Sequence, residues 1–232
     1  MSESPPFMGG EVILFILFVI LILVAGIWSA IAARKRREAL SKLAARLGLN
    51  FEPDRNHALA SRFHFLDRLA QGSNRYAFNL LHGRLDTHEV HAFDYHYETY
   101  SRDNKGRRST HHHYFSCFVV MLPASFPELT ITREGILSKI AQAFGYDDID
   151  FESAEFSRRF CVRSKNKRFA YDVCHPRMME HLLANRDLSV EIENDALALL
   201  FDRRLDAAGI ERNLTRLIEL RVLLPDYLFT RA

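Results

Sequence analysis

An uninterrupted apolar segment near the N-terminus constrains the fold of this chain more than any other feature. Val12 to Ala33 reads VILFILFVILILVAGIWSAIAA and contains no charged residue. As a helix it would be about 33 Å long, enough to cross the ~30 Å hydrocarbon core of a bilayer. A helix also satisfies its own backbone hydrogen bonds, as lipid requires. The segment therefore predicts a single transmembrane helix at 12–33, after a short extracytoplasmic N-terminus at 1–11.

Charged residues on the two sides of this segment predict its orientation. Glu3 and Glu11 precede it, without any lysine or arginine. Four basic residues follow it directly: Arg34, Lys35, Arg36 and Arg37. The positive-inside rule then places the N-terminus outside and the bulk of the chain in the cytoplasm. The same four basic residues are predicted to face anionic lipid at the cytoplasmic surface.

A cleaved signal peptide is the alternative interpretation, because Ala30-Ile31-Ala32 matches the A-x-A pattern of a cleavage site. The residues before the segment are acidic instead of basic, however, and the apolar run is longer than the usual ~7–15 residues. A basic cluster directly after the run is typical of a stop-transfer sequence. These features favour an uncleaved anchor.

The charge balance argues against a nucleic-acid-binding protein. The chain has 31 Lys and Arg against 29 Asp and Glu. All the basic residues lie at or beyond Arg34, and only two acidic residues precede it. Without the four-residue basic cluster, residues 38–232 carry equal numbers of basic and acidic side chains. A dedicated nucleic-acid binder usually has a strong basic excess, so no nucleic-acid partner is expected.

Residues 34–48 are predicted to form a helical stalk, with Leu40, Leu43 and Leu47 at helical spacing and Gly48 at its C-terminal end. The remainder, 49–232, is predicted to be a cytoplasmic domain, either undivided or made of two subdomains that meet near 145–155. Three cysteines in the whole chain exclude a disulfide scaffold. They are expected to be buried thiols in a reducing compartment.

Strand and helix signals alternate through this domain. Aromatic-rich runs predict strands at 76–85 and 88–100, joined by a turn at Asp86-Thr87. Further strands are predicted at 110–122, ended by Pro123 and Pro127, and at 129–132, 159–163 and 168–174. A hairpin is predicted at 189–193 and 196–201. Helices are predicted at 134–144, from Pro176 to about 184, and at about 210–223. The hairpin-plus-helix order predicts an α+β fold with a mostly antiparallel sheet and packed helices.

Several segments carry a resemblance to known sequences. The N-terminal anchor, the run GRLDTHEVHAFDYHYET, the F-C-V…F-A-Y-D-V…Pro…LL segment and the IEND-ALALL hairpin are similar to bacterial single-pass membrane-anchored families catalogued as domains of unknown function. The similarity covers 34 to about 205. It implies a bacterial, membrane-tethered module with no established activity, and it supplies no catalytic residues.

Histidine is concentrated in the two strands around 88–113, which predicts a candidate metal site. If the hairpin tip lies at Asn104-Lys105, Glu98 faces His111 and His96 faces His113. His96, Glu98, His111 and His113 would then share one face, a ligand set suited to zinc. The alternative is a polar hairpin with His–Glu and His–Tyr cross-strand pairs, and a shift of one residue would rearrange the partners.

One acidic and two basic clusters are the other candidate binding sites in the sequence. The acidic run at 147–152 lacks the pattern of a calcium-binding loop. Basic residues gather at two predicted turns, around 102–108 and 158–168, where they suit solvent or an acidic surface. No nucleotide-binding or hydrolase motif occurs.

The sequence therefore predicts a membrane-tethered cytoplasmic binding or scaffolding module with a protein partner at the inner membrane. The alternatives are a zinc-dependent hydrolase that uses the histidine face and a sensor of anionic lipid.

Overall fold

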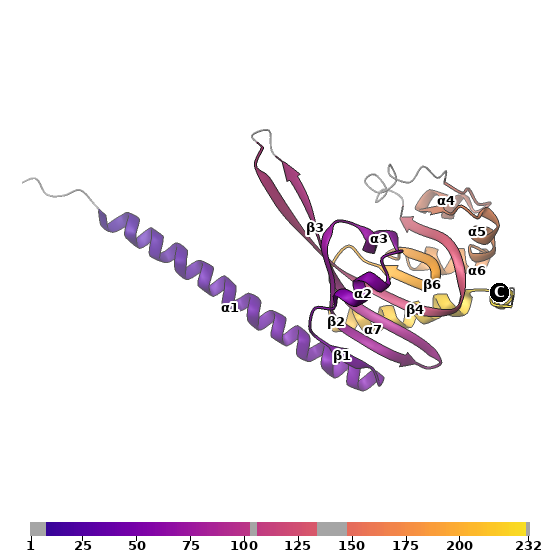
Figure 1. The fold of residues 1–232 in the computed structure, drawn as a ribbon, viewed down its shortest axis with the longest axis horizontal. Helices are drawn as coiled ribbons and strands as arrows, with labels where there is room; N and C mark the ends of the chain where they lie inside the picture. Colours follow the sequence, from indigo (N-terminus) through magenta and orange to yellow (C-terminus); the bar gives the residue numbers. More distant parts are fainter. Residues whose placement is uncertain (1–7, 103–105, 134–147, 231–232) are drawn as a thin grey trace, which may run out of the picture.

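The computed structural model of the chain describes residues 8–102, 106–133 and 148–230. Its most extended element is α1 (Met8–Leu47), one continuous helix of 40 residues that projects away from the rest of the protein (Figure 1). Within it, Val12–Leu47 is long and apolar enough to cross a membrane. Its most apolar 18-residue window has a mean hydropathy of 3.1, and none of that window is buried. The predicted transmembrane segment thus lies in the exposed part of α1.

The C-terminal part of α1 belongs to the folded domain. Leu40, Leu43 and Ala44 are at most 2% exposed, in the same hydrophobic cluster as Leu81. Gly48 follows the helix with φ +69°, the left-handed conformation that glycine adopts at helix ends, as predicted. The segment predicted as a stalk at 34–48 is helical to Leu47 and packs against the domain that was predicted to begin at 49. The apolar stripe of this segment is part of the domain core.

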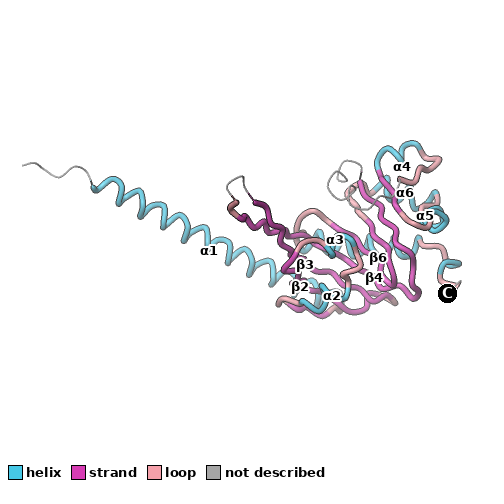
Figure 2. Tube along the Cα trace, turned by 45° about the horizontal axis from the view of Figure 1, so that its top comes forward, coloured by secondary structure: helices cyan, strands magenta, loops and turns pink. Residues whose placement is uncertain are grey.

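The described strands form one antiparallel sheet (Figure 2). They are β1 (Asn50–Glu52), β2 (Ser73–Leu85), β3 (His88–Arg102), β4 (Arg108–Arg133), β5 (Phe160–Arg163) and β6 (Val190–Leu200). β1 to β5 neighbour one another in chain order, and β6 pairs with β4. Asp86, with φ +54°, lies in the predicted turn between β2 and β3. The predicted α+β fold with an antiparallel sheet is confirmed.

β4 is a long strand that bends, so that both of its halves pair with β6. Its first half pairs with β3 and with the second half of β6, and its second half pairs with β5 and with the first half of β6. The β4–β6 register shifts between Met121 and Leu129, where Pro123 and Pro127 have no amide to donate. The prediction that these prolines end the strand is wrong, since β4 continues past the interruption in its pairing.

β6 folds back on itself at Asn194, which has φ +50°. The amide of Leu200 donates to the carbonyl of Ser189 (3.0 Å), so the two ends of β6 lie side by side. This geometry agrees with the predicted hairpin at 189–193 and 196–201.

Helices cover both faces of the sheet. They are α2 (His57–Arg62), α3 (Asp67–Ala70), α4 (Ala154–Arg159), α5 (Lys167–Val173), α6 (Pro176–Ala184) and α7 (Ala207–Leu223), with a final 3-10 turn at Asp226–Leu228. Pro176 begins α6 as predicted. The predicted strand at 168–174 is wrong, because the Asn166 side chain accepts a hydrogen bond from the Phe169 amide and so begins a helix there. The predicted helix at 134–144 lies outside the described residues.

The sheet separates two hydrophobic clusters. One joins the end of α1 with α5, α6 and α7, and the other joins α2 and α3 with the opposite face of β3 and β4. Both clusters include residues from before and after 145–155, and one sheet runs through them. The described residues therefore form one domain, without the two subdomains considered from the sequence.

Glu191 on β6 makes the stability of this domain depend on pH. Its side chain lies in the core with Oε2 unpaired among the described residues, and burial raises its pKa to about 8. The folded protein therefore keeps a proton that the unfolded chain releases above about pH 4.5. The free energy of unfolding should fall between about pH 5 and 8, by up to about 1.4 kcal/mol per pH unit.

Glu191→Gln should remove this decline, because glutamine has nearly the same shape and no proton to lose. Unfolding of the full chain in detergent, followed across that pH range, measures the slope. Glu152→Gln, at an exposed position, is the matched control and should keep the wild-type slope. An unchanged slope in Glu191→Gln would contradict the assignment.

Candidate functional site

A buried ion pair joins α1 to the sheet. The guanidinium of Arg36 on α1 donates to both carboxylate oxygens of Asp94 on β3, and also to the carbonyl of Leu205 (2.7 Å). Asp94 is 1% exposed and accepts two further hydrogen bonds, from Asn79 Nδ2 (2.9 Å) and Ser116 Oγ (3.0 Å). Both carboxylate oxygens are therefore satisfied, as a buried charge requires. This network fixes α1 against β2, β3 and β4.

The four basic residues predicted to face lipid have different surroundings. Arg34 pairs with Glu38 (3.0 Å) on the exposed side of α1, and Lys35 is exposed as well. Arg37 lines a pocket between α1 and the sheet. Arg36 is mostly buried, and its charge is neutralised by Asp94. Of the four basic residues, Arg36 is therefore the one whose charge is used inside the domain.

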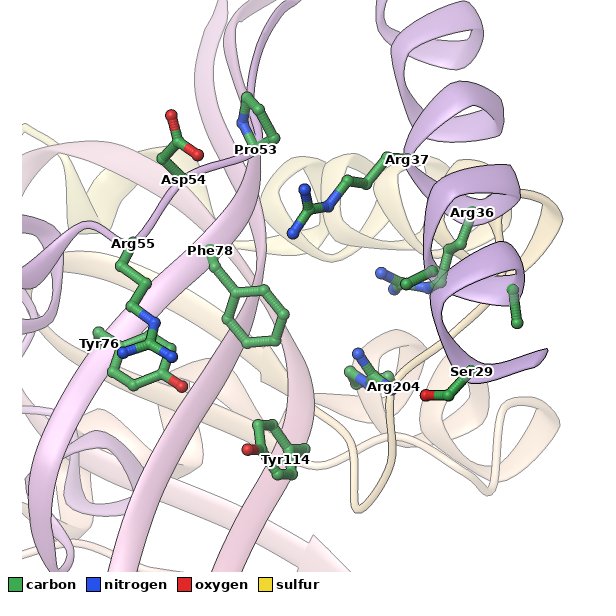
Figure 3. A pocket seen from close by; sticks show the side chains of 12 residues that line it. Ser29, Arg36, Arg37, Pro53, Asp54, Arg55, Tyr76, Phe78, Tyr114 and Arg204 are labelled. Carbon is green, nitrogen blue, oxygen red and sulfur yellow. The ribbon is translucent and has the colours of Figure 1, made fainter. Parts of the chain in front are cut away.

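The pocket has a volume of about 800 Å³ and lies between α1 and the exposed ends of β2 and β4 (Figure 3). Its residues on α1 are Ser29, Ala32, Ala33, Arg36 and Arg37, which span the junction between the apolar segment and the basic cluster. The opposite wall consists of Pro53, Asp54, Arg55, Tyr76, Phe78, Tyr114 and Arg204. If α1 spans a bilayer, this pocket lies at the level of the lipid headgroups.

The pocket has an excess of positive charge. Arg55 lies over the ring of Tyr76 (4.6 Å) and Arg204 lies over that of Tyr114 (5.6 Å), so the aromatic rings hold both guanidinium groups (Figure 3). Within the described part of the chain, neither these arginines nor Arg37 has a carboxylate partner. Asp54 is the acidic residue of the lining, and Arg36 is already neutralised. The pocket lining therefore carries three arginines without a carboxylate partner among the described residues, and one acidic residue.

The histidine-rich hairpin pairs in a register one residue away from the predicted one. Glu98 lies opposite His112, and Thr99 lies opposite His111. His96 and His112 therefore share a face with Glu98, whereas His113 stacks on Tyr97 on the other face. The predicted set of His96, Glu98, His111 and His113 is not brought together. A different set, His96, Glu98 and His112, has its potential ligand atoms within 4.8 Å of one another.

The protonation states in this cluster suit metal ligands. Burial lowers the pKa of His96, so the imidazole is neutral at neutral pH. A hydrogen bond from Asn74 and a second, smaller contribution from Tyr100 lower the pKa of Glu98, which is therefore a carboxylate. Neutral imidazole and ionised carboxylate are the forms that coordinate cations.

The remaining candidates are structural. Cys117, Cys161 and Cys174 are buried thiols that form no disulfide, as predicted. Burial raises the pKa of Cys174 to about 12, and the neighbouring His175 donates to the Leu223 carbonyl, so the pair has no catalytic geometry. In the acidic run, Asp148 accepts from the Val162 amide (2.8 Å).

The fold and site define an α+β domain whose N-terminal helix combines an apolar segment with core packing. No protein-family model matches the chain, and no curated protein matches it. Among solved structures, the crystal structure of the mycobacterial trehalose monomycolate transport factor A, TtfA, is similar. The TM-score is 0.55 at 13% identity, over 83% of this chain and 96% of that chain. At this identity the likeness shows a shared fold. The resemblance to bacterial families of unknown function stays a prediction.

Sequence reasoning predicted that Arg37 faces lipid, but it missed Arg55, Arg204 and the pocket that the three residues line. The three arginines are far apart in the chain and share no motif. The fold brings them together, so no local pattern marked Arg55 or Arg204.

Proposed function

We propose that the chain is a membrane-tethered cytoplasmic binding module that holds the headgroup of an anionic phospholipid in the pocket between α1 and the sheet. The observation that carries this proposal is the position of three arginines in one pocket beside the junction between the apolar segment and the basic cluster of α1, none of them with a carboxylate partner among the described residues. An anionic-lipid sensor was one alternative from the sequence, and the pocket supplies a defined place for it.

The chemistry of the lining supports a phosphate ligand. Guanidinium groups bind phosphate through paired N–H donors, and Arg55 and Arg204 are already oriented by the rings beneath them. A pocket of about 800 Å³ has room for a headgroup and its glycerol portion. Phe78 and Tyr114 give the wall an apolar surface for the beginning of an acyl chain.

The orientation of the anchor supports the same ligand. The basic cluster after the apolar segment predicts a domain on the cytoplasmic side, by the positive-inside rule. The cytoplasmic leaflet carries anionic lipid, which attracts basic groups by about 1 kcal/mol for each charge near the surface. A site held at headgroup level by α1 therefore meets its ligand at high local concentration.

A protein partner at the inner membrane remains part of the proposal. The similar fold of a protein described as a transport factor is compatible with an accessory role beside other membrane components. Purification of the full chain from native membranes in mild detergent, with mass spectrometry of the co-purifying proteins, tests it. A stoichiometric partner would support the scaffolding role, and a chain that purifies alone would count against it.

Native mass spectrometry of the full chain tests the lipid proposal directly. Phosphatidylglycerol should remain bound after detergent is removed, whereas phosphatidylcholine should not. A parallel experiment measures the binding of inorganic phosphate. Retention of phosphate without lipid would assign the pocket to a soluble anion instead. Equal retention of both lipids would contradict a headgroup site.

A further inference from the structure

The hairpin formed by β3 and β4 carries a second cluster that the phospholipid proposal does not use. Glu98 and His112 are directly opposed across the two strands, and His96 lies two residues along β3 on the same face. This face also carries Asp94, whose carboxylate binds Arg36 of α1. The hairpin end and α1 project from the same side of the domain in both views (Figures 1 and 2).

We propose that His96, Glu98 and His112 bind a divalent transition-metal ion, with zinc as the ion that fits the ligand set best. Two imidazole nitrogens and one carboxylate oxygen, with a fourth position left open, form a common zinc coordination set. Hard cations such as magnesium prefer sites made of oxygen ligands.

The distances match the size of the ion. His96 Nε2 lies 3.1 Å from His112 Nδ1, and His112 Nδ1 lies 3.5 Å from Glu98 Oε1. Tetrahedral zinc with bonds of about 2.0–2.2 Å places neighbouring ligand atoms about 3.3–3.6 Å apart. The two distances from His112 Nδ1 are therefore close to those of a coordinated ion, and all three ligand atoms lie within 4.8 Å of one another.

The partners of His96 orient its free nitrogen. His96 Nδ1 donates to the backbone carbonyl of Asn74 (3.0 Å), which leaves the lone pair of Nε2 directed at the cluster. Tyr76 and Tyr114 lie against the imidazole, with ring centroids 4.5 and 4.7 Å away. A backbone carbonyl behind a ligating imidazole is a usual feature of metal sites, because it fixes the tautomer and the ring.

Glu98 is held in the same way. Its Oε1 accepts from Asn74 Nδ2 (2.6 Å), and its Oε2 accepts from the Tyr100 hydroxyl (2.9 Å). Asn74 therefore supports both ligands, from a backbone with φ +50°. Gly72 permits this approach, because a Cβ there would lie 2.3 Å from the Glu98 carbonyl oxygen. Residues 72–74, where β2 begins, therefore position both His96 and Glu98.

Exposure differs among the three ligands and defines how the site opens. His96 is 1% exposed, whereas the side chain of His112 is 51% exposed. The ion would be anchored on the buried side and open to solvent on the other, where water or an anionic oxygen completes the coordination. Without metal, the N–H of His112 Nδ1 donates a hydrogen bond to His96 Nε2. A bound ion would take the place of that proton.

Titration of the chelator-treated full chain with Co²⁺, followed by competition with Zn²⁺, tests the site. One equivalent of Co²⁺ should bind, with the intense visible absorption of a four-coordinate ion, and Zn²⁺ should displace it. His112→Ala changes a half-exposed side chain and should fold normally, yet lower Zn²⁺ affinity by at least tenfold. Asn74→Ala, which removes support from Glu98, should lower it by about tenfold.

His111→Ala is the matched control, because His111 is the neighbour of His112 and bonds Ser101 on the opposite side of the strand. It should bind Zn²⁺ as the wild type does. A wild-type chain that takes up no stoichiometric Co²⁺ or Zn²⁺ would overturn the proposal. Equal losses in His111→Ala and His112→Ala would overturn the assignment of ligands. Neither outcome bears on phospholipid retention, which is measured separately.

Discussion

Asp94→Asn should destabilise the domain by about 3 kcal/mol, the largest effect expected for any single polar substitution in the described chain. The change keeps the shape and the acceptor for Ser116, but it leaves the Arg36 guanidinium half-buried without a counter-charge. Removing one partner of a buried pair typically costs about 3–5 kcal/mol. Because the Arg36 side chain is 19% exposed, water reduces that cost toward the lower end.

Thermal unfolding of the full chain in detergent, followed by near-ultraviolet circular dichroism, measures the effect. Arg34→Gln is the control, since the Arg34–Glu38 pair is exposed and should contribute no more than about 0.5 kcal/mol. The double variant Arg36→Met with Asp94→Asn should recover part of the loss, because it removes both charges. If Asp94→Asn were as stable as the Arg34 control, the ion pair would not hold α1 to the sheet.

The triple substitution Arg37→Gln, Arg55→Gln and Arg204→Gln should abolish selective retention of phosphatidylglycerol, with a loss of at least tenfold. Each arginine lines the pocket, and none has a carboxylate partner within the described residues. The domain should therefore keep its stability to within about 1 kcal/mol. Loss of lipid with an unchanged unfolding temperature separates a binding role from a structural one.

A matched control removes the same charge from other positions. Arg34→Gln, Lys35→Gln and Arg212→Gln changes two residues of the juxtamembrane cluster and one exposed residue of α7, none of which lines the pocket. General attraction to an anionic surface should weaken in this variant, but the selective retention of lipid should persist. If both triple variants lost lipid equally, net charge and not the pocket would govern binding.

Patterns of short range explain what the sequence revealed about the fold. The transmembrane segment follows from its length and apolarity, and Pro176 marks the start of α6 because its missing amide costs nothing there. The strands at 76–85 and 88–100 follow from aromatic content and the turn at Asp86. The segment at 168–174 was predicted as a strand because its apolar residues fit the pattern of a short strand. It is a helix, which the Asn166 side chain caps.

The candidate sites depended on contacts that no local pattern encodes. The metal-ligand set changed because the hairpin register is one residue away from the assumed one, and such a slip exchanges His111 and His113 for His112. Arg36 looked like part of a topogenic cluster, but its partner Asp94 lies 58 residues away. The pocket needs α1, β2 and the loop before α7 together, so Arg55 and Arg204 carried no signal in the sequence, and Arg37 was predicted to face lipid only as part of the basic cluster.

The most direct test of the phospholipid pocket is photo-cross-linking from inside it. A benzophenone amino acid in place of Phe78, in the full chain reconstituted into vesicles that contain phosphatidylglycerol, should give a phospholipid adduct by mass spectrometry. The same probe in place of Tyr171, which is exposed on α5, is the comparison and should give none. An adduct at position 78 that disappears in the triple arginine variant is the predicted result. No adduct at 78, or equal adducts at both positions, would contradict a headgroup site between α1 and the sheet.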